Sequence, residues 1–299
     1  MQWFQLKEQG AGTKRLILTW YLYKIFGEKA LRCIAFCMSL FILVFSHDIR
    51  KSSKKYLQII YPETKIHPNL LNQFKHILNY ANSLADKILI FSGNFNVENI
   101  KFENEEIRNE LFQNINKKQG VFFLCNHVGN VEAMQAFFLN KKTNPVFGVN
   151  IFISRKQSKI FNKFLKNIGK EIPAKIYNVE DIGIETGIEI KQNLDKGEIV
   201  FIAGDRLSEN DSRTRKNNTK TEMFSHTIYL PKGSFKLAKL MNTKIYFISL
   251  IKFDEKYTIF LDKANNLSEE NLVKSFIEFE EKMILKNPYQ FFNFYDFFE

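Results

Sequence analysis

Short apolar runs alternate with stretches of helical periodicity from Phe95 to the C-terminus. This alternation is typical of an α/β domain in which helices flank a mostly parallel or mixed central sheet. Strands are expected at Val121 to Cys125, Pro145 to Ile151, Ile199 to Ala203, Lys244 to Ile251 and Tyr257 to Leu261. Helices are expected at Asn130 to Leu139, Ser158 to Ile168, Val179 to Leu194, Lys232 to Met241 and Ser268 to Leu285. The 299 residues are enough for one such domain and a small addition to it.

The first ninety or so residues have helical periodicity throughout. We therefore expect an N-terminal helical region at residues 1–92 and the α/β domain at residues 93–299. The run from Cys33 to Ser46 (CIAFCMSLFILVFS) has no charge, and as a helix its 14 residues extend about 21 Å, short of the ~30 Å hydrocarbon core of a membrane. Residues of about 31–46 are expected to anchor the chain to a membrane. A buried core helix is the alternative.

Basic residues follow this apolar run, in the segment HDIRKSSKKYL. Arg50, Lys51, Lys54 and Lys55 suit the anionic cytoplasmic surface of a membrane. A cleaved signal peptide is not expected, because the segment before the apolar run is too long and no small-residue cleavage site follows it. We expect the anchor to stay attached and the body of the protein to be cytoplasmic.

The net charge and the cysteine content limit which binding partners and which kinds of metal or disulfide site are expected. Lys and Arg outnumber Asp and Glu by 43 to 32, and the formal net charge of +11 favours polyanionic partners. The three cysteines, Cys33, Cys37 and Cys125, are too few for a disulfide framework or a zinc site, which indicates a reducing compartment. Because no metalloprotease, Cys-x-x-Cys, P-loop or dinucleotide motif is present, no metal or organic cofactor is expected.

His127 and Glu132 lie where the expected strand in VFFLCNHVGNVEAM is followed by a helix. On one continuous helix, residues five apart point about 140° away from each other and cannot cooperate. With Asn130 as the N-cap, His127 lies in the preceding turn and Glu132 in the first helical turn, from which it can reach an imidazole nitrogen. Gly129 permits this tight turn. A histidine held by a carboxylate can act as a general base, and a capped helix start with a satisfied histidine is the alternative.

A polar segment from Asp205 to Glu222 is long for a connection in a compact domain, which indicates a functional lid or disorder. It follows a strand, and open α/β sheets bind ligands at the carboxyl ends of their strands, so Asp205 and Arg206 are expected at a site. The amides of Gly233 and Ser234 begin an expected helix and suit an anion such as a phosphate group. A solvated cation at Arg206 and an ordinary turn at Gly233 are the alternatives.

Four ordered segments resemble the lysophospholipid acyltransferase superfamily. The box from His127 to Glu132 matches its His-x4-Asp/Glu motif, and the version NHVGNVE, which begins at Asn126, is similar to the lipid A late-acyltransferase branch (lauroyl/myristoyl transferases). LDKGEIVFIAGDRLSEN and YLPKGSFKLAKLMNTKIYFISL resemble that branch's acidic loop, with Asp205 at the acidic position, and its apolar-Pro-x-Gly box. NPYQFFNFYDFF resembles the C-terminal signature of a subgroup, although Phe291 stands where Trp is usual.

The resemblance implies direct transfer of an acyl chain from a thioester of acyl carrier protein or coenzyme A to a hydroxyl of a lipid or glycolipid, at the cytoplasmic face of a bacterial inner membrane. His127 would act as the general base and Glu132 would orient it, without an acyl-enzyme. The expected substrate-binding residues are Asn126, Asn130, Asp205, Arg206, Gly233 and Ser234, with Arg155 and Lys156 as candidates for a donor-side basic position. No metal or organic cofactor is implied.

The main alternative is a basic lipid- or nucleic-acid-binding protein without catalysis, since the net charge of +11 also suits phosphate contacts. Nucleic acid is disfavoured because the charge is spread along the chain and most of the 31 phenylalanines fall in apolar runs. A lipid hydrolase is disfavoured because no Gly-x-Ser-x-Gly elbow is present. The aromatic side chains of the C-terminal tail are expected to close the core near an acyl groove.

Overall fold

The computed structural model describes residues 13–140, 148–169, 173–207, 218–264 and 268–299. Seven of the described strands form one sheet in the order β1-β9-β8-β2-β5-β3-β4. Its strands are β1 Lys101–Phe102, β2 Val121–Gly129, β3 Val149–Ile153, β4 Lys175–Asn178, β5 Ile199–Ala203, β8 Lys244–Phe253 and β9 Lys256–Lys263. β2 is parallel to β5 and β8, and β3 is parallel to β4 and β5, whereas β9 is antiparallel to β8. The predicted α/β class with a mostly parallel, mixed sheet is confirmed.

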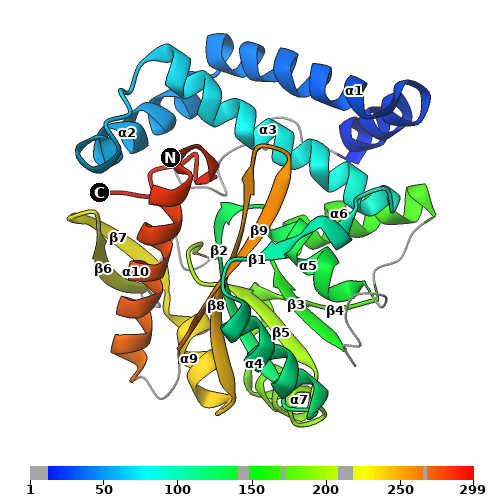
Figure 1. The fold of residues 1–299 in the computed structure, drawn as a ribbon, viewed down its shortest axis with the longest axis vertical. Helices are drawn as coiled ribbons and strands as arrows, with labels where there is room; N and C mark the ends of the chain where they lie inside the picture. The colour runs from blue at the N-terminus through cyan, green and yellow to red at the C-terminus, as the bar shows by residue number, and fades with distance from the viewer. Residues whose placement is uncertain (1–12, 141–147, 170–172, 208–217, 265–267) are drawn as a thin grey trace.

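Helices cover both faces of this sheet (Figure 1). They are α4 Glu105–Asn116, α5 Val131–Leu139, α6 Arg155–Ile168, α7 Ile184–Asp195, α9 Lys232–Leu240 and α10 Glu269–Lys286. Phe122 and Leu124 of β2 pack in one core with side chains of α7, α9 and α10, whereas Phe123 and Cys125 pack in another with α4 and α5. Successive side chains of a strand point to opposite faces, so both faces of β2 are buried and its sequence is apolar throughout.

Most predicted elements are present with shifted ends. β5 has its predicted bounds, whereas β2 and β8 extend to Gly129 and Phe253. The strand expected from Pro145 is described from Val149, and residues 141–147 lie outside the described part of the chain. The sequence pattern did not indicate α4, β4 or the hairpin of β6 (Asn218–Met223) and β7 (His226–Pro231), because these elements are short or mostly polar. Within the expected lid, residues 205–207 follow β5, residues 208–217 are outside the described residues, and residues 218–222 belong to β6.

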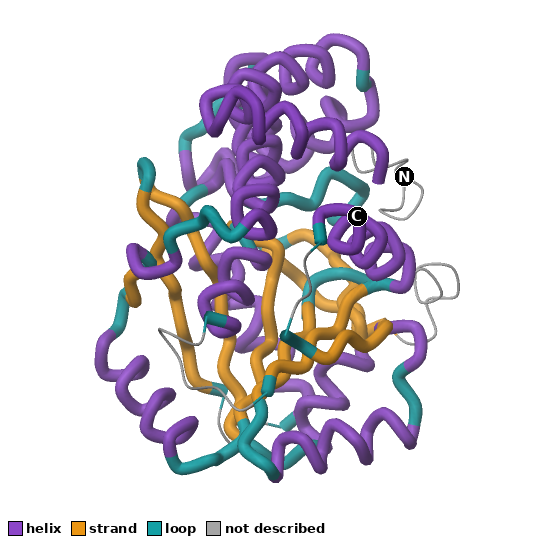
Figure 2. Tube along the Cα trace, turned by 90° about the vertical axis from the view of Figure 1, so that its right-hand side faces the viewer, coloured by secondary structure: helices purple, strands orange, loops and turns teal. Residues whose placement is uncertain are grey.

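Three helices, α1 Thr13–Phe45, α2 His47–Thr64 and α3 Leu70–Ser92, form a layer across the end of the sheet where β8 turns into β9 (Figure 1). Figure 2 shows the same layer from the side, beyond the ends of the strands. Gly27 interrupts α1 with a φ of 74°, in the left-handed region that favours glycine. α2 buries Tyr56, Leu57 and Ile60 in the core that it shares with α10. The helical layer is therefore packed against the α/β domain.

The helix α1 presents many large apolar side chains to solvent. They are Leu18, Tyr21, Ile25, Phe26, Phe36, Met38, Leu40, Phe41, Val44 and Phe45. No described helix has by itself the length and composition of a membrane span, whereas the segments Leu16–Phe45 and His47–Thr64 together reach them across a bend of 92°. Attachment to a membrane through residues of about 31–46 stays a prediction.

Candidate active site

Two neighbouring parallel strands, β2 and β5, bring His127 and Asp205 together. Cys125 of β2 pairs with Ala203 of β5, and His127 and Asp205 each lie two residues beyond this pair. Their side chains therefore meet at the carboxyl edge of the sheet, where open α/β folds place their ligands. The register of β2 with β8 shifts between Cys125 and Gly129, which leaves His127 outside the regular ladder.

Asp205 holds His127 through two hydrogen bonds. The Nδ1 atom of His127 lies 2.7 Å from Oδ1 of Asp205, and the backbone N–H of His127 donates to Oδ2 over 2.8 Å. The Asp205 side chain is fully buried, whereas that of His127 is 22% exposed. Because an ionised carboxylate only accepts hydrogen bonds, Nδ1 carries the proton and Nε2 presents its lone pair.

The surroundings of this pair favour a neutral imidazole beside a carboxylate. Burial, and then the charge of Arg206, lower the pKa of His127 below its usual value, and Asp205 opposes them. Burial by itself would raise the pKa of Asp205, but the charge and the hydrogen bonds of His127, together with Arg206, outweigh burial and hold that pKa below its ordinary value. At neutral pH, Nε2 is therefore able to accept a proton.

Glu132 lies at the same site but forms its hydrogen bond elsewhere. Its carboxylate forms an ion pair and a hydrogen bond with Lys87 of α3. The hydrogen bond expected between Glu132 and the His127 imidazole is absent among the described residues, because Asp205 from the adjacent strand occupies Nδ1 and Lys87 faces the first turn of α5. Glu132 still acts on His127 through space, since its charge raises the pKa of that histidine.

The start of α5 has the predicted construction. Asn130 is the N-cap, and its Oδ1 accepts a hydrogen bond from the backbone N of Ala133 over 3.0 Å. Gly129 has a φ of +85°, and a Cβ at this position would lie 1.9 Å from the carbonyl oxygen of Leu250. The turn after His127 therefore requires glycine.

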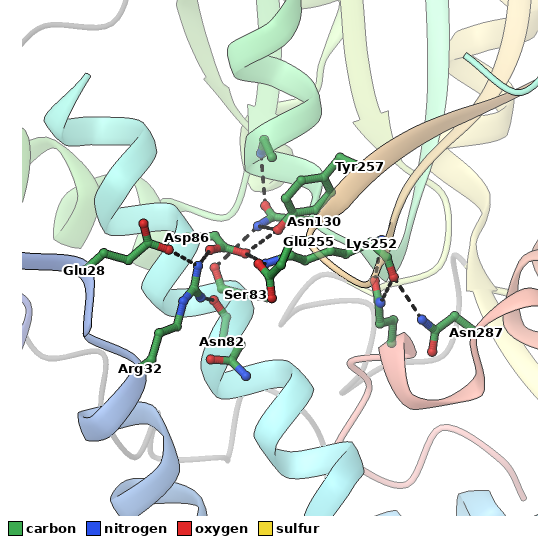
Figure 3. Close-up of polar contacts among 12 residues, drawn as sticks. Glu28, Arg32, Asn82, Ser83, Asp86, Asn130, Lys252, Glu255, Tyr257 and Asn287 are labelled. Atoms are coloured by element: carbon green, nitrogen blue, oxygen red, sulfur yellow. Dashed lines mark hydrogen bonds and ion pairs between the residues drawn. The ribbon is translucent and has the colours of Figure 1, made fainter. Parts of the chain in front are cut away.

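A buried polar cluster adjoins Asn130 on the side of the N-terminal helices (Figure 3). Asp86 of α3, whose side chain is 3% exposed, bonds to Arg32 of α1 and to the hydroxyl of Tyr257. The Nδ2 atom of Asn130 lies 3.4 Å from that hydroxyl and 3.4 Å from the carbonyl oxygen of Ser83. The Asn130 amide is thus engaged by the protein and lines a second cavity, not the one that contains His127.

The other expected substrate-binding residues divide between the His127 cavity and the interior. Arg206, Gly233 and Ser234 line the cavity. Asn126 is buried and is not among the cavity residues, and its Oδ1 accepts a hydrogen bond from the hydroxyl of Ser249 over 2.7 Å. Asn126 therefore ties the end of β2 to β8.

The cavity that contains His127 has a volume of about 500 Å³. Its polar end is formed by His127, Glu132, Lys87, Arg206 and Ser234. The apolar part of the lining, called the apolar arm below, includes residues of β3, β4, β5 and α6 and is formed by Ile151, Phe152, Ile153, Ile160, Leu165, Ile176, Val179, Ile182, Phe201 and Ile202. Residues of α1 and α3 contribute a further wall. A polar end with a histidine and a carboxylate thus adjoins an apolar arm in one cavity.

The C-terminal tail contacts the site more closely than the sequence analysis expected. Its aromatic side chains are buried and Phe292 lines the cavity, which agrees with core closure beside a groove. In addition, the backbone N of Phe292 donates to the carbonyl oxygen of His127 over 3.0 Å, and Nδ2 of Asn293 donates to Oδ2 of Asp205 over 3.3 Å. Sequence reasoning missed Asn293, whose only signal is a polar residue inside an aromatic run.

The candidate donor-side residues lie outside the cavity. Arg155 forms an ion pair with Asp181, its backbone N donates to Glu180 over 2.9 Å, and Lys156 is exposed. Within the part of the chain that the structure describes, no group of three His, Cys, Asp or Glu side chains is placed to hold a metal ion.

No protein-family model and no curated protein matches the chain.

Proposed function

We propose that this protein is an O-acyltransferase that moves a fatty acyl chain from a thioester to a hydroxyl of a lipid or glycolipid, with His127 as the general base. The observation that carries the proposal is the position of the His127–Asp205 pair. Nε2 of a neutral imidazole, held by a buried carboxylate, faces a cavity that joins a polar end to an apolar arm. Acyl transfer to an alcohol needs this combination of a base and an acyl groove.

In the proposed reaction, Nε2 of His127 removes the proton of the acceptor hydroxyl as its oxygen attacks the thioester carbonyl. Asp205 stabilises the imidazolium that forms. The tetrahedral oxyanion is stabilised by Arg206 and by the amides at the start of α9, near Gly233 and Ser234. The C–S bond then breaks, and the imidazolium returns its proton to the thiolate. The products are an ester and a free thiol.

Direct transfer is favoured because the described residues that line the cavity include no activated nucleophile beside His127. The hydroxyl of Ser234 donates to the carbonyl oxygen of Ala203 over 2.9 Å. Burial raises the pKa of the Cys125 thiol well above its usual value, so that it stays protonated and unreactive. Neither side chain is prepared to form an acyl-enzyme.

The donor is proposed to be an acyl thioester of acyl carrier protein or coenzyme A, both of which are anionic. Lys156, Lys159, Lys163 and Lys166 are exposed along one stripe of α6, and none has an ion-pair partner among the described residues. Other residues of this helix, including Ile160 and Leu165, line the apolar arm. An anionic carrier bound at the stripe would lie directly above the acyl groove.

The acceptor is proposed to be a membrane lipid of the lipid A type, reached at the cytoplasmic face of a bacterial inner membrane. The exposed apolar side chains of α1 suit a membrane surface, and the basic residues Arg50, Lys51 and Lys54 of α2 suit its anionic head groups. Leu16 of α1 also lines the His127 cavity, so a lipid that approaches along α1 is close to the reacting centre.

The test is lipid mass spectrometry of cells that have or lack the gene, with the wild-type protein or the His127→Ala variant supplied in trans. A lipid that is heavier by one acyl group should be present with the wild-type protein and absent with the variant, while both proteins sediment with membranes. Identical lipids in all cells would refute acyl transfer. The heavier lipid in cells that carry the His127→Ala variant would refute the role of His127.

A further inference from the structure

The segment of residues 291–293 is the part of the tail that meets the His127–Asp205 pair. We infer that Asn293 is a positioning residue, which orients the Asp205 carboxylate toward His127 and keeps the Arg206 guanidinium away from that carboxylate. The effect of Asn293 on catalysis rests on the proposed function. Its effect on the pKa and the tautomer of His127 can be measured without a substrate.

The side-chain amide of Asn293 hydrogen-bonds to both Asp205 and Arg206, as donor to the carboxylate and as acceptor from the guanidinium. Its Nδ2 donates to Oδ2 of Asp205 over 3.3 Å, and its Oδ1 accepts from Nε of Arg206 over 2.8 Å. A carboxylate at this position could not donate to Asp205, and an aliphatic side chain could serve neither group. Asn293 is buried, so its hydrogen bonds do not exchange freely with water.

Arg206 is the group that would otherwise compete for Asp205. It follows Asp205 directly in the chain, and a guanidinium beside a buried carboxylate tends to form a bidentate ion pair. Its Nε instead donates to Asn293, and its Nη2 donates to the carbonyl oxygen of Phe292 over 2.7 Å. No ion pair joins Arg206 to Asp205, both of which the structure describes, and both carboxylate oxygens remain bonded to His127.

The backbone places Asn293 in register with the strand that carries His127. Phe291 forms an isolated antiparallel bridge with Val128, and Phe292 N donates to the carbonyl oxygen of His127 over 3.0 Å. The carbonyl oxygen of Phe291 accepts a hydrogen bond from Nε2 of His76 over 2.7 Å, inside the helical layer. The tail is therefore held from both sides immediately before Asn293.

The experiment uses the full-length protein, labelled with ¹⁵N-histidine, in its wild-type form and as Asn293→Leu and Asn293→Asp. Tyr289→Phe is the matched control, because it removes a different tail hydrogen bond, from the Tyr289 hydroxyl to Oδ1 of Asn72 over 2.8 Å. NMR titration follows the tautomer and the pKa of His127, whose signal is identified among the five histidines with His127→Gln. Initial rates are measured with dodecanoyl, myristoyl and palmitoyl acyl carrier protein and a membrane-lipid extract.

Asn293→Leu should lower the pKa of His127, because the released Arg206 can pair with Asp205 and weaken the bond of that carboxylate to the imidazole. It should lower kcat by about tenfold with little change in KM, as expected when a hydrogen bond to a charged group is lost. Asn293→Asp should move the acid limb of the rate profile to higher pH, because the added carboxylate raises the pKa of His127. Tyr289→Phe should match the wild type in all three measurements.

An unchanged His127 pKa and tautomer in both Asn293 variants would overturn the positioning role, whatever reaction the protein catalyses. The same shifts in Tyr289→Phe would overturn it too, because they would show a general loosening of the tail. A shifted pKa in the Asn293 variants with no acyl transfer by the wild-type protein would leave the positioning role standing and count against the proposed function.

Discussion

Asp205→Asn is expected to lower kcat by about 10²-fold or more, whereas Glu132→Gln lowers it by less than about tenfold. The Nδ1–H bond of His127 to Asp205, 2.7 Å long, becomes charge-assisted when the imidazolium forms. Such a bond contributes about 1.5–3 kcal/mol, and each ~1.4 kcal/mol changes the rate tenfold, so its loss corresponds to about 10- to 150-fold. The new amide can also donate to Nδ1, which moves the imidazole proton to Nε2 and removes the base.

The smaller effect of Glu132→Gln follows from its surroundings. The Glu132 side chain is 34% exposed, its carboxylate is paired with Lys87, and it acts on His127 only through space. Partly exposed ion pairs contribute about 1 kcal/mol or less, which corresponds to roughly fivefold in rate.

The assay compares initial rates of both variants with acyl carrier protein thioesters and a membrane-lipid extract, with Asp181→Asn as a control for removal of an exposed carboxylate. Thermal unfolding of each variant verifies that the fold is retained. Because burial lowers the pKa of His127, the acid limb of the wild-type kcat/KM profile should lie below about pH 6.5. A larger loss for Glu132→Gln than for Asp205→Asn would refute the assignment of Asp205 as the residue that orients His127.

Three further changes test the core, the surface of α1 and the apolar arm. Glu280 is fully buried, and neither of its carboxylate oxygens has a hydrogen-bond partner among the described residues. Burial raises the pKa of Glu280 well above its usual value. The free energy of unfolding therefore falls as the pH rises from the unfolded-state pKa of this group through its folded-state pKa. Glu280→Met should therefore stabilise the protein by about 1–3 kcal/mol at pH 7 and by less at pH 4, in denaturant unfolding with the exposed Glu278→Met as control. Phe41 and Phe45 are 53% and 71% exposed. Changing both to Lys should release the folded protein from membranes in a sedimentation assay. Sedimentation at the wild-type level would rule out membrane contact through this face of α1. Val179→Trp should fill part of the apolar arm and shift the transferred chains toward shorter lengths, as measured by mass spectrometry with mixed thioesters, and an unchanged distribution would mean that the acyl chain binds elsewhere.

Local sequence was sufficient to predict the fold class and the construction of the turn after His127. Strands buried on both faces need continuous apolar runs, which is why β5 was predicted with its observed bounds. Asn130 caps the backbone N of Ala133, three residues further on, and Gly129 has a positive φ, so the N-cap and the turn could be predicted from neighbouring residues. The close approach of the Leu250 carbonyl oxygen to Gly129 is a long-range contact that these residues do not indicate. Elements such as β4 and β6, whose residues are mostly polar or half-buried, left no such pattern.

Only the tertiary structure decided which groups hold the histidine. The sequence determined that His127 lies near the end of a strand, that Glu132 is in the first turn of the next helix and that Asp205 follows another strand. Proximity along the chain favoured Glu132 as the partner of His127. The parallel pairing of β2 with β5 instead places Asp205, 78 residues away, against Nδ1. Strand order and the packing of the tail depend on contacts between distant segments, and no local pattern of residues encodes their distances.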